Sequence, residues 1–191
     1  MFFCASLLLI YSSSLGQDES LSEGATILFK DIESRLTNSD KNQIFNASGF
    51  QLSKDKTQFH FNDGTAAEFP FNTLVFPLDL NGDGIEEVAI QYGNTFTSGM
   101  EGMSFYLFIK DKDGMYQSNL GFPGVLLLAT TYHLDFPDIL IGGAGFQPYP
   151  AYRWNGQRYD FFEKIERQVA DEMPPVFVTQ ASNAYLESIQ H

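Results

Sequence analysis

Apolar residues recur at steps of three and four near the start of the chain, which is the spacing of one helix face. Ser20 and Glu23 have the spacing of a capping box, so a helix is expected to begin there. The segment 37–40 is expected to end it and to cap a shorter helix over 41–47, which 48–49 stops. The stripe on the first helix consists of Leu21, Ala25, Leu28, Ile32 and Leu36.

From residue 50 the period changes to two, as in Gln58-Phe59-His60-Phe61, and this alternation is typical of strands. The pairs Asp113-Gly114 and Asn155-Gly156 lie between apolar runs and predict tight turns of β-hairpins. After Met173 a short helix is expected around 181–189. Strands are expected over Thr73–Leu78, Glu87–Tyr92, Ser104–Lys110, Val125–Thr131, Asp138–Ile141, Ala151–Trp154 and Tyr159–Lys164.

These elements predict an α+β to mainly β fold. The N-terminal helices are expected to pack on a sandwich-like antiparallel assembly of roughly six to eight strands. The chain divides into a signal peptide over 1–16, a helical segment over 17–49 and a β-rich domain over 50–170. A tail with room for a short helix follows over 171–191.

A weak repeat runs through the β-rich part. Glu87-Val88-Ala89-Ile90 is echoed by Asp138-Ile139-Leu140-Ile141, and each is followed by an aromatic strand and then a turn. The pattern predicts two copies of one strand–hairpin unit stacked together. Chance similarity between two hairpins is the alternative.

The N-terminus has the features of a secretory signal peptide. Residues 1–10 are almost entirely apolar, and Ser14 and Gly16 are small residues that fit a cut before Gln17. The run is too short for a membrane-spanning helix, so no transmembrane segment is expected. The predicted location is therefore secreted or periplasmic, and a buried N-terminal strand is the alternative. Cys4, the one cysteine of the chain, lies within this segment.

The formal net charge of −13 narrows the range of partners. Nucleic acids and anionic membranes attract Lys and Arg, so neither is expected to bind. A protein or a glycan is the expected partner. The charge also suits a cation site, although it equally serves to keep an exported protein soluble.

The segment 79–87 carries the clearest chemistry. Asp79, Asn81 and Asp83 place side-chain oxygens at alternate positions, and Gly84 permits the sharp bend that follows. The carbonyl of Ile85 and the carboxylate of Glu87 complete a set of oxygen ligands that suits Ca²⁺ better than zinc. A turn that merely connects two strands is the alternative. Position 12 of an EF-hand would be Ile90, in a predicted strand, so the loop is not an EF-hand.

The run from Asp79 to Ile90 resembles the calcium loop of FG-GAP and VCBS-type repeats, such as those of integrin propeller blades. The resemblance implies one Ca²⁺ bound between adjacent strands by Asp79, Asn81, Asp83, the Ile85 carbonyl and Glu87. The second copy, around 135–143, lacks the Asp-Gly bend, so no metal is assigned to it. Two copies are also too few for a propeller.

A second candidate site follows Gly142, Gly143 and Gly145. Phe146, Tyr149, Tyr152 and Trp154 lie beside them and would form an aromatic face for a sugar or a protein loop, or else pack in the interior. The leading interpretation is an exported, calcium-binding, non-enzymatic binding or structural module, and no catalytic residue is assigned. An exported hydrolase or hydrolase inhibitor with a structural Ca²⁺ is the first alternative, and a carbohydrate-binding module is the second.

Overall fold

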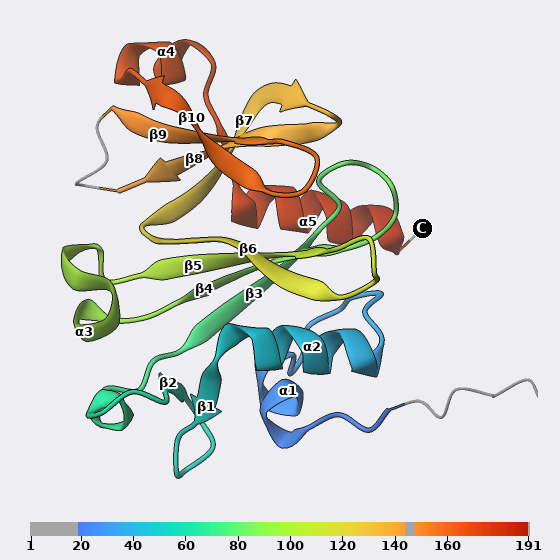
Figure 1. The fold of residues 1–191 in the computed structure, drawn as a ribbon, viewed down its shortest axis with the longest axis vertical. Helices are drawn as coiled ribbons and strands as arrows, with labels where there is room; N and C mark the ends of the chain where they lie inside the picture. Colours follow the sequence, from blue (N-terminus) through green and yellow to red (C-terminus); the bar gives the residue numbers. More distant parts are fainter. Residues whose placement is uncertain (1–18, 144–147, 191) are drawn as a thin grey trace, which may run out of the picture.

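Two antiparallel sheets packed face to face form the centre of the protein in the described residues, 19–143 and 148–190 (Figure 1). The structure is a computed structural model. The predicted signal peptide lies outside the described residues. The first sheet has the order β3-β4-β5-β6 and the second has the order β10-β9-β8-β7-β11. The α+β to mainly β class expected from the sequence is confirmed.

The strands of the first sheet are β3 (Thr73–Leu78), β4 (Glu87–Tyr92), β5 (Ser104–Lys110) and β6 (Tyr116–Pro123). Those of the second are β7 (Val125–His133), β8 (Phe136–Gly142), β9 (Tyr149–Trp154), β10 (Tyr159–Ile165) and the short edge strand β11 (Val176–Phe177). A separate hairpin pairs β1 (Phe50–Leu52) with β2 (Phe59–Phe61).

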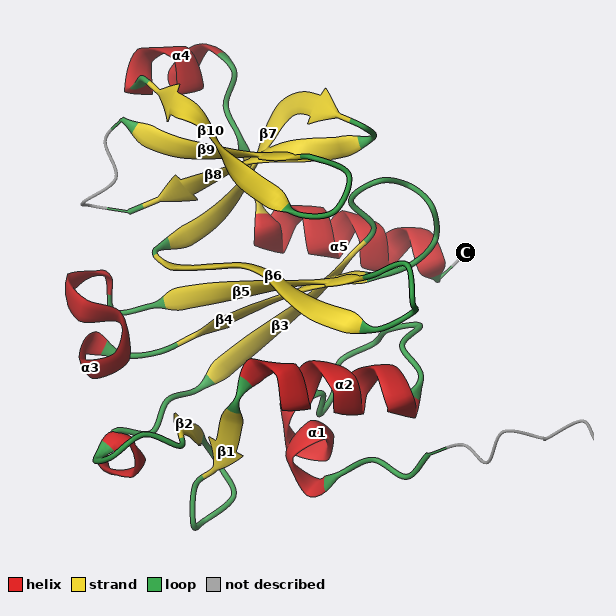
Figure 2. Cartoon of the chain, in the orientation of Figure 1, coloured by secondary structure: helices red, strands yellow, loops and turns green. Residues whose placement is uncertain are grey.

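The helices are α1 (Glu23–Leu28), α2 (Asn38–Ser48), α3 (Thr95–Ser98), α4 (Arg167–Glu172) and α5 (Val178–Ile189), with 3₁₀ turns η1 (Ala66–Glu68) and η2 (Gly99–Glu101). Figure 2 shows α1 and α2 on the free side of the first sheet and α4 on the free side of the second. No helix in the described ranges has both the length and the apolar character that a membrane crossing requires.

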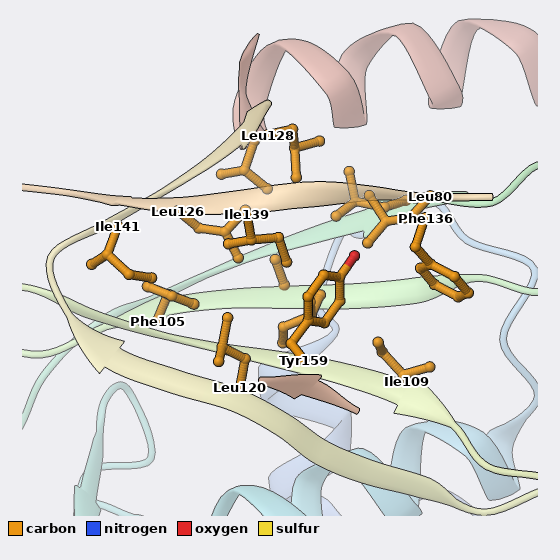
Figure 3. Packing of buried hydrophobic residues seen from close by; sticks show 14 residues of the cluster. Leu80, Phe105, Ile109, Leu120, Leu126, Leu128, Phe136, Ile139, Ile141 and Tyr159 are labelled. Atoms are coloured by element: carbon orange, nitrogen blue, oxygen red, sulfur yellow. The ribbon is translucent and has the colours of Figure 1, made fainter. Parts of the chain in front are cut away.

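The inter-sheet core fills the space between the two sheets (Figure 3). Because successive side chains on a strand point to opposite faces, Ile139 and Ile141 of β8 face the first sheet, whereas Leu140 belongs to a cluster on the other side. Leu107 and Leu120 approach them from β5 and β6. This core joins the two sheets, and Val178 at the start of α5 contributes to it.

A second core lies between the first sheet and the N-terminal segments. Val88, Ile90 and Phe108 point from the sheet toward Ile44 of α2 and Phe50 of β1. The first sheet is therefore covered on both faces, which explains why the sequences of β4 and β5 are nearly continuous apolar runs.

The single helix expected over 20–36 is wrong. The helix α1 ends at Leu28, and Asp31 has a positive φ of 59°, which breaks any helical path. Its N-cap is Ser22, which accepts a hydrogen bond from the Ala25 amide, and not Ser20. Leu36 is still buried, but it lies in a loop. The apolar spacing therefore marked buried positions correctly without marking a continuous helix.

The two sheets repeat one arrangement. In each, four consecutive strands form an antiparallel meander. Tyr116 at the start of β6 donates to the Glu86 carbonyl at 2.6 Å, and Tyr159 at the start of β10 donates to the Pro137 carbonyl at 2.9 Å. Each acceptor precedes the acidic residue of its copy, Glu87 or Asp138. The same hydrogen bond therefore links the fourth strand to the second in both copies.

The copies differ in the connection between their first two strands. In the second copy, β7 and β8 are joined through Leu134 and Asp135, with φ values of 50° and 68°. Positive φ at both central residues is typical of a two-residue hairpin turn. The first copy has the longer loop at 79–86 in this place, which explains why only the first copy carries the acidic pattern.

The helix α2 is fixed to the first sheet by a carboxylate. Asp40 completes a capping box with Thr37. Its Oδ1 also forms an ion pair with Lys110 Nζ of β5 at 2.8 Å. Burial acts to raise the pKa of Asp40, but the hydrogen bonds from Lys110 and Thr37 outweigh it and hold the pKa below its usual value.

Asp40→Asn should lower the free energy of unfolding by about 1–3 kcal/mol at pH 7, because it removes hydrogen bonds to a charged acceptor. The lowered pKa means that the native stabilisation is present above pH 3.8 and is lost as the pH falls through the folded-state value. The difference between Asp40→Asn and wild type, measured by urea unfolding, should therefore shrink below that pH. Asp63→Asn, at an exposed turn, is the control and should change little. A difference independent of pH would contradict this account.

Tyr159→Phe and Tyr116→Phe should each destabilise the protein by about 1–3 kcal/mol, because each leaves a buried carbonyl without its donor. Burial raises the pKa of both phenols well above the usual value, so both remain donors at any ordinary pH. Chemical denaturation measures the effect, with Tyr132→Phe on the exposed end of β7 as the control. If one of these variants loses stability and the other does not, the two tyrosine hydrogen bonds do not have equivalent roles.

Candidate metal centre

The predicted calcium loop connects β3 to β4 at one end of the first sheet. Its Leu80 side chain is buried in the inter-sheet core, which anchors the loop to the body of the protein. Gly82 and Gly84 have positive φ values of 73° and 81°, so the chain reverses within a few residues. The loop thus has one anchored side and one exposed tip.

Hydrogen bonds organise the tip of the loop. Asp79 accepts from the Gly84 amide at 3.1 Å, and Asp83 accepts from the Ile85 amide at 2.7 Å. The Asn81 side chain accepts from the Asp83 amide at 3.1 Å and donates to the Asp83 carboxylate at 2.9 Å. The structure therefore brings Asp79, Asn81 and Asp83 together around one turn.

Glu87 lies at the base of the loop, only 2% exposed, and its carboxylate accepts from the Leu80 amide at 2.7 Å. Burial raises its pKa to about 8, and the charges of Asp83 and Asp79 act in the same direction, whereas the hydrogen bond from Leu80 lowers it. The loop therefore holds a buried carboxyl group that has no cationic partner among the described residues.

One oxygen of the loop is unsatisfied. Asp79 Oδ1 is buried and has no hydrogen-bond partner within the described part of the chain. Such an atom destabilises the fold by about 1–3 kcal/mol, or more when charged, unless something pairs with it. The loop side chains do not already form a metal cage, because no group of three or more His, Cys, Asp or Glu side chains in the described ranges is arranged to hold an ion.

Glu86 is a neighbouring residue that the sequence did not single out. Its carboxylate accepts from the Arg35 amide at 2.7 Å and from the Tyr185 hydroxyl at 2.9 Å, and Oε2 is buried without a partner. It thereby joins the loop to the segment before α2 and to α5. The alternating pattern pointed only to Glu87, and nothing in the sequence marks the distant partners of Glu86.

The residues of the predicted aromatic ligand face lie on opposite sides of the second sheet. Tyr152 and Trp154 pack against the inter-sheet core, where Tyr152 lies 5.0 Å from Phe122 and Trp154 stacks at 4.5 Å on Phe136. Tyr149 packs against the cluster on the opposite face. Phe146 lies outside the described residues. The period of two on β9 separates these side chains, so Tyr149 does not share a surface with Tyr152 and Trp154.

Tyr185→Phe should lower the free energy of unfolding by about 1–3 kcal/mol, because it removes a donor from a carboxylate that already has one unpaired buried oxygen. It should also increase proteolytic cleavage near α5, measured on the native protein. Ser188→Ala is the control on the same helix, since the Ser188 hydroxyl donates to the Tyr185 carbonyl within α5 and not to another element of the described structure. Unchanged stability with Tyr185→Phe would mean that Glu86 does not hold α5.

Comparisons with known proteins add no identity to this geometry: no family model, curated protein or solved structure matches the chain.

Proposed function

We propose that this protein is an exported, non-enzymatic binding or structural module whose 79–87 loop binds one Ca²⁺. The observation that carries the proposal is the buried, unpaired Asp79 Oδ1 in a loop whose side-chain oxygens already gather around one turn. A cation is the partner that would satisfy this atom and offset three carboxylates at once.

The available donors fit Ca²⁺ by their chemistry. Asp79, Asp83 and Glu87 supply carboxylate oxygens, Asn81 supplies an amide oxygen and Ile85 supplies a carbonyl. Hard oxygen ligands of this kind are those that Ca²⁺ takes in proteins. The chemistry that the ion supplies is charge neutralisation together with a link between the end of β3 and the start of β4.

The residues around the loop extend this role to the whole fold. Leu80 carries the loop into the inter-sheet core, and Glu86 connects it to Arg35 and Tyr185. Ordering the loop therefore favours the native contacts of both sheets and of α5. An ion that binds only the native state stabilises it by mass action.

Export is part of the same proposal. The apolar segment at 1–10 and the small residues before Gln17 support secretion or transfer to the periplasm. The chain after residue 16 contains no cysteine, so its stability outside a reducing compartment does not depend on thiol chemistry. Extracellular calcium modules bind their ion with dissociation constants of about 10⁻⁴ to 10⁻³ M.

Calorimetric titration of Ca²⁺ into the chelator-treated protein should give one site. At a Ca²⁺ concentration of about 100 times the dissociation constant, the native state gains about 2.7 kcal/mol. For a domain of this size the melting temperature should rise by about 5–10 °C, because about 1 kcal/mol corresponds to 2–4 °C.

Asp83→Asn should abolish most of the heat of binding and of the rise in melting temperature. Asp113→Asn removes the same charge from the exposed β5–β6 turn and should leave both unchanged. The proposal fails if wild type shows no saturable Ca²⁺ heat and no change in melting temperature, or if the two variants behave alike.

A further inference from the structure

A cavity of about 340 Å³ lies on the face of the second sheet that points away from the first sheet. The chain leaves β10 at one edge of this sheet and reaches β11 at the other edge through the crossover segment 166–175, which includes α4. Figure 1 shows α4 on this outer side. The cavity lies between the crossover segment and the sheet, and its volume falls at the lower end of the range of small-molecule sites.

Small side chains on the sheet create the cavity. Ala129 of β7 and Ala151 of β9 lie beside Leu140 of β8, and the two alanines leave space that larger residues would fill. Val169 and Met173 of the crossover segment provide an apolar wall and are themselves 41% and 50% exposed. The body of the cavity therefore suits an apolar group.

The corresponding face of the first sheet explains why this cavity is open. There, the second sheet itself covers residues such as Ala89 and Leu107 and fills the space with the inter-sheet core. In the described residues no further sheet covers the outer face of the second sheet, and the six-residue helix α4 covers only part of it. The outer face of the second sheet is therefore apolar but only partly covered.

One end of the cavity is polar and rigid. Asp138, 4% exposed, accepts from Arg153 Nε at 2.8 Å, from Arg153 Nη2 at 2.7 Å and from the Thr131 hydroxyl at 2.6 Å. The Arg153 guanidinium also lies 3.5 Å over the Phe162 ring. Both contacts hold the guanidinium in place before any ligand arrives.

At this end of the cavity the groups that can still form hydrogen bonds are donors. Asp138 already accepts three hydrogen bonds, whereas the Arg153 guanidinium has five N–H groups and forms only these two hydrogen bonds within the described residues. The edge of the guanidinium that does not face Asp138 can still donate to a planar acceptor. A ligand must therefore present an acceptor at this end of the cavity.

The surrounding charges limit that acceptor to a single negative charge. Asp138 is paired with Arg153, the charge of Glu163 also acts on Arg153, and Lys164 and Glu166 are the other charged residues that line the cavity. A phosphate dianion would meet more repulsion than attraction, whereas a carboxylate matches the remaining guanidinium edge in shape and charge.

We propose that this cavity binds a small monocarboxylic acid with an apolar body, the carboxylate on Arg153 and the apolar part against Ala129, Leu140 and the crossover segment. This site is separate from the 79–87 loop, and it does not require that the loop bind Ca²⁺.

Octanoate is the probe, titrated by calorimetry into the full chain, with 1-octanol as the comparison that lacks the carboxylate. Octanoate should bind at one site, and 1-octanol should bind at least about tenfold more weakly, a difference of about 1.4 kcal/mol. The proposal is overturned if octanoate gives no saturable binding at millimolar concentration, or if 1-octanol binds equally well.

Two variants locate the site while leaving the Asp138–Arg153 pair intact. Ala129→Phe fills the cavity and should weaken octanoate binding at least about tenfold, whereas Ala67→Phe on the exposed turn η1 should not. Val169→Asp, at a partly exposed position, tests the same site without filling it, and it should weaken octanoate more than 1-octanol by charge repulsion. Unchanged octanoate binding in a folded Ala129→Phe or Val169→Asp protein would place the ligand elsewhere and contradict the proposal.

Discussion

The apolar contact between the two sheets is the interaction on which the other parts of the structure depend. Each meander has one inner face of buried aliphatic and aromatic side chains, and neither can exclude water without the other. The helix α5 enters this contact through Val178, and the 79–87 loop enters it through Leu80. Placement of the candidate metal centre is therefore a consequence of sheet packing. The buried Leu80 side chain links the shape of the loop to this contact, so an ion that favours this shape favours the packed sheets.

The outer faces of the two sheets have different surroundings, although the sheets repeat one arrangement. The N-terminal helices and the β1–β2 hairpin cover the first sheet with a second core. Within the described residues the crossover segment alone covers the second sheet, and the remaining space is the cavity over Leu140. The acidic residue of each copy reflects this difference. Glu87 is buried and has no cationic partner in the described part of the chain, whereas Asp138 on the open side has Arg153 as a partner.

Strands with strong alternation or continuous apolar character were predictable, and β3, β4 and β5 have the expected bounds. The Asp113-Gly114 turn implied a strand after it, but no range was predicted for β6, because this strand lies at an edge and carries polar residues such as Gln117 and Ser118. Local chemistry also predicted the turn shared by Asp79, Asn81 and Asp83. The role of Glu86 and the cavity beside Arg153 depend on contacts between residues far apart in the chain. Their sequence neighbours contain no signal for such contacts, and only the fold brings them together.

The central claim is that Ca²⁺ in the 79–87 loop stabilises the packing of both sheets. Amide hydrogen exchange of the native protein, measured with Ca²⁺ and with chelator, tests it most directly. Ca²⁺ is expected to slow exchange in the loop and in β3 and β4, and also in β8 and α5, which the inter-sheet core and Glu86 connect to it. Equal exchange rates in these segments with and without Ca²⁺ would contradict the account.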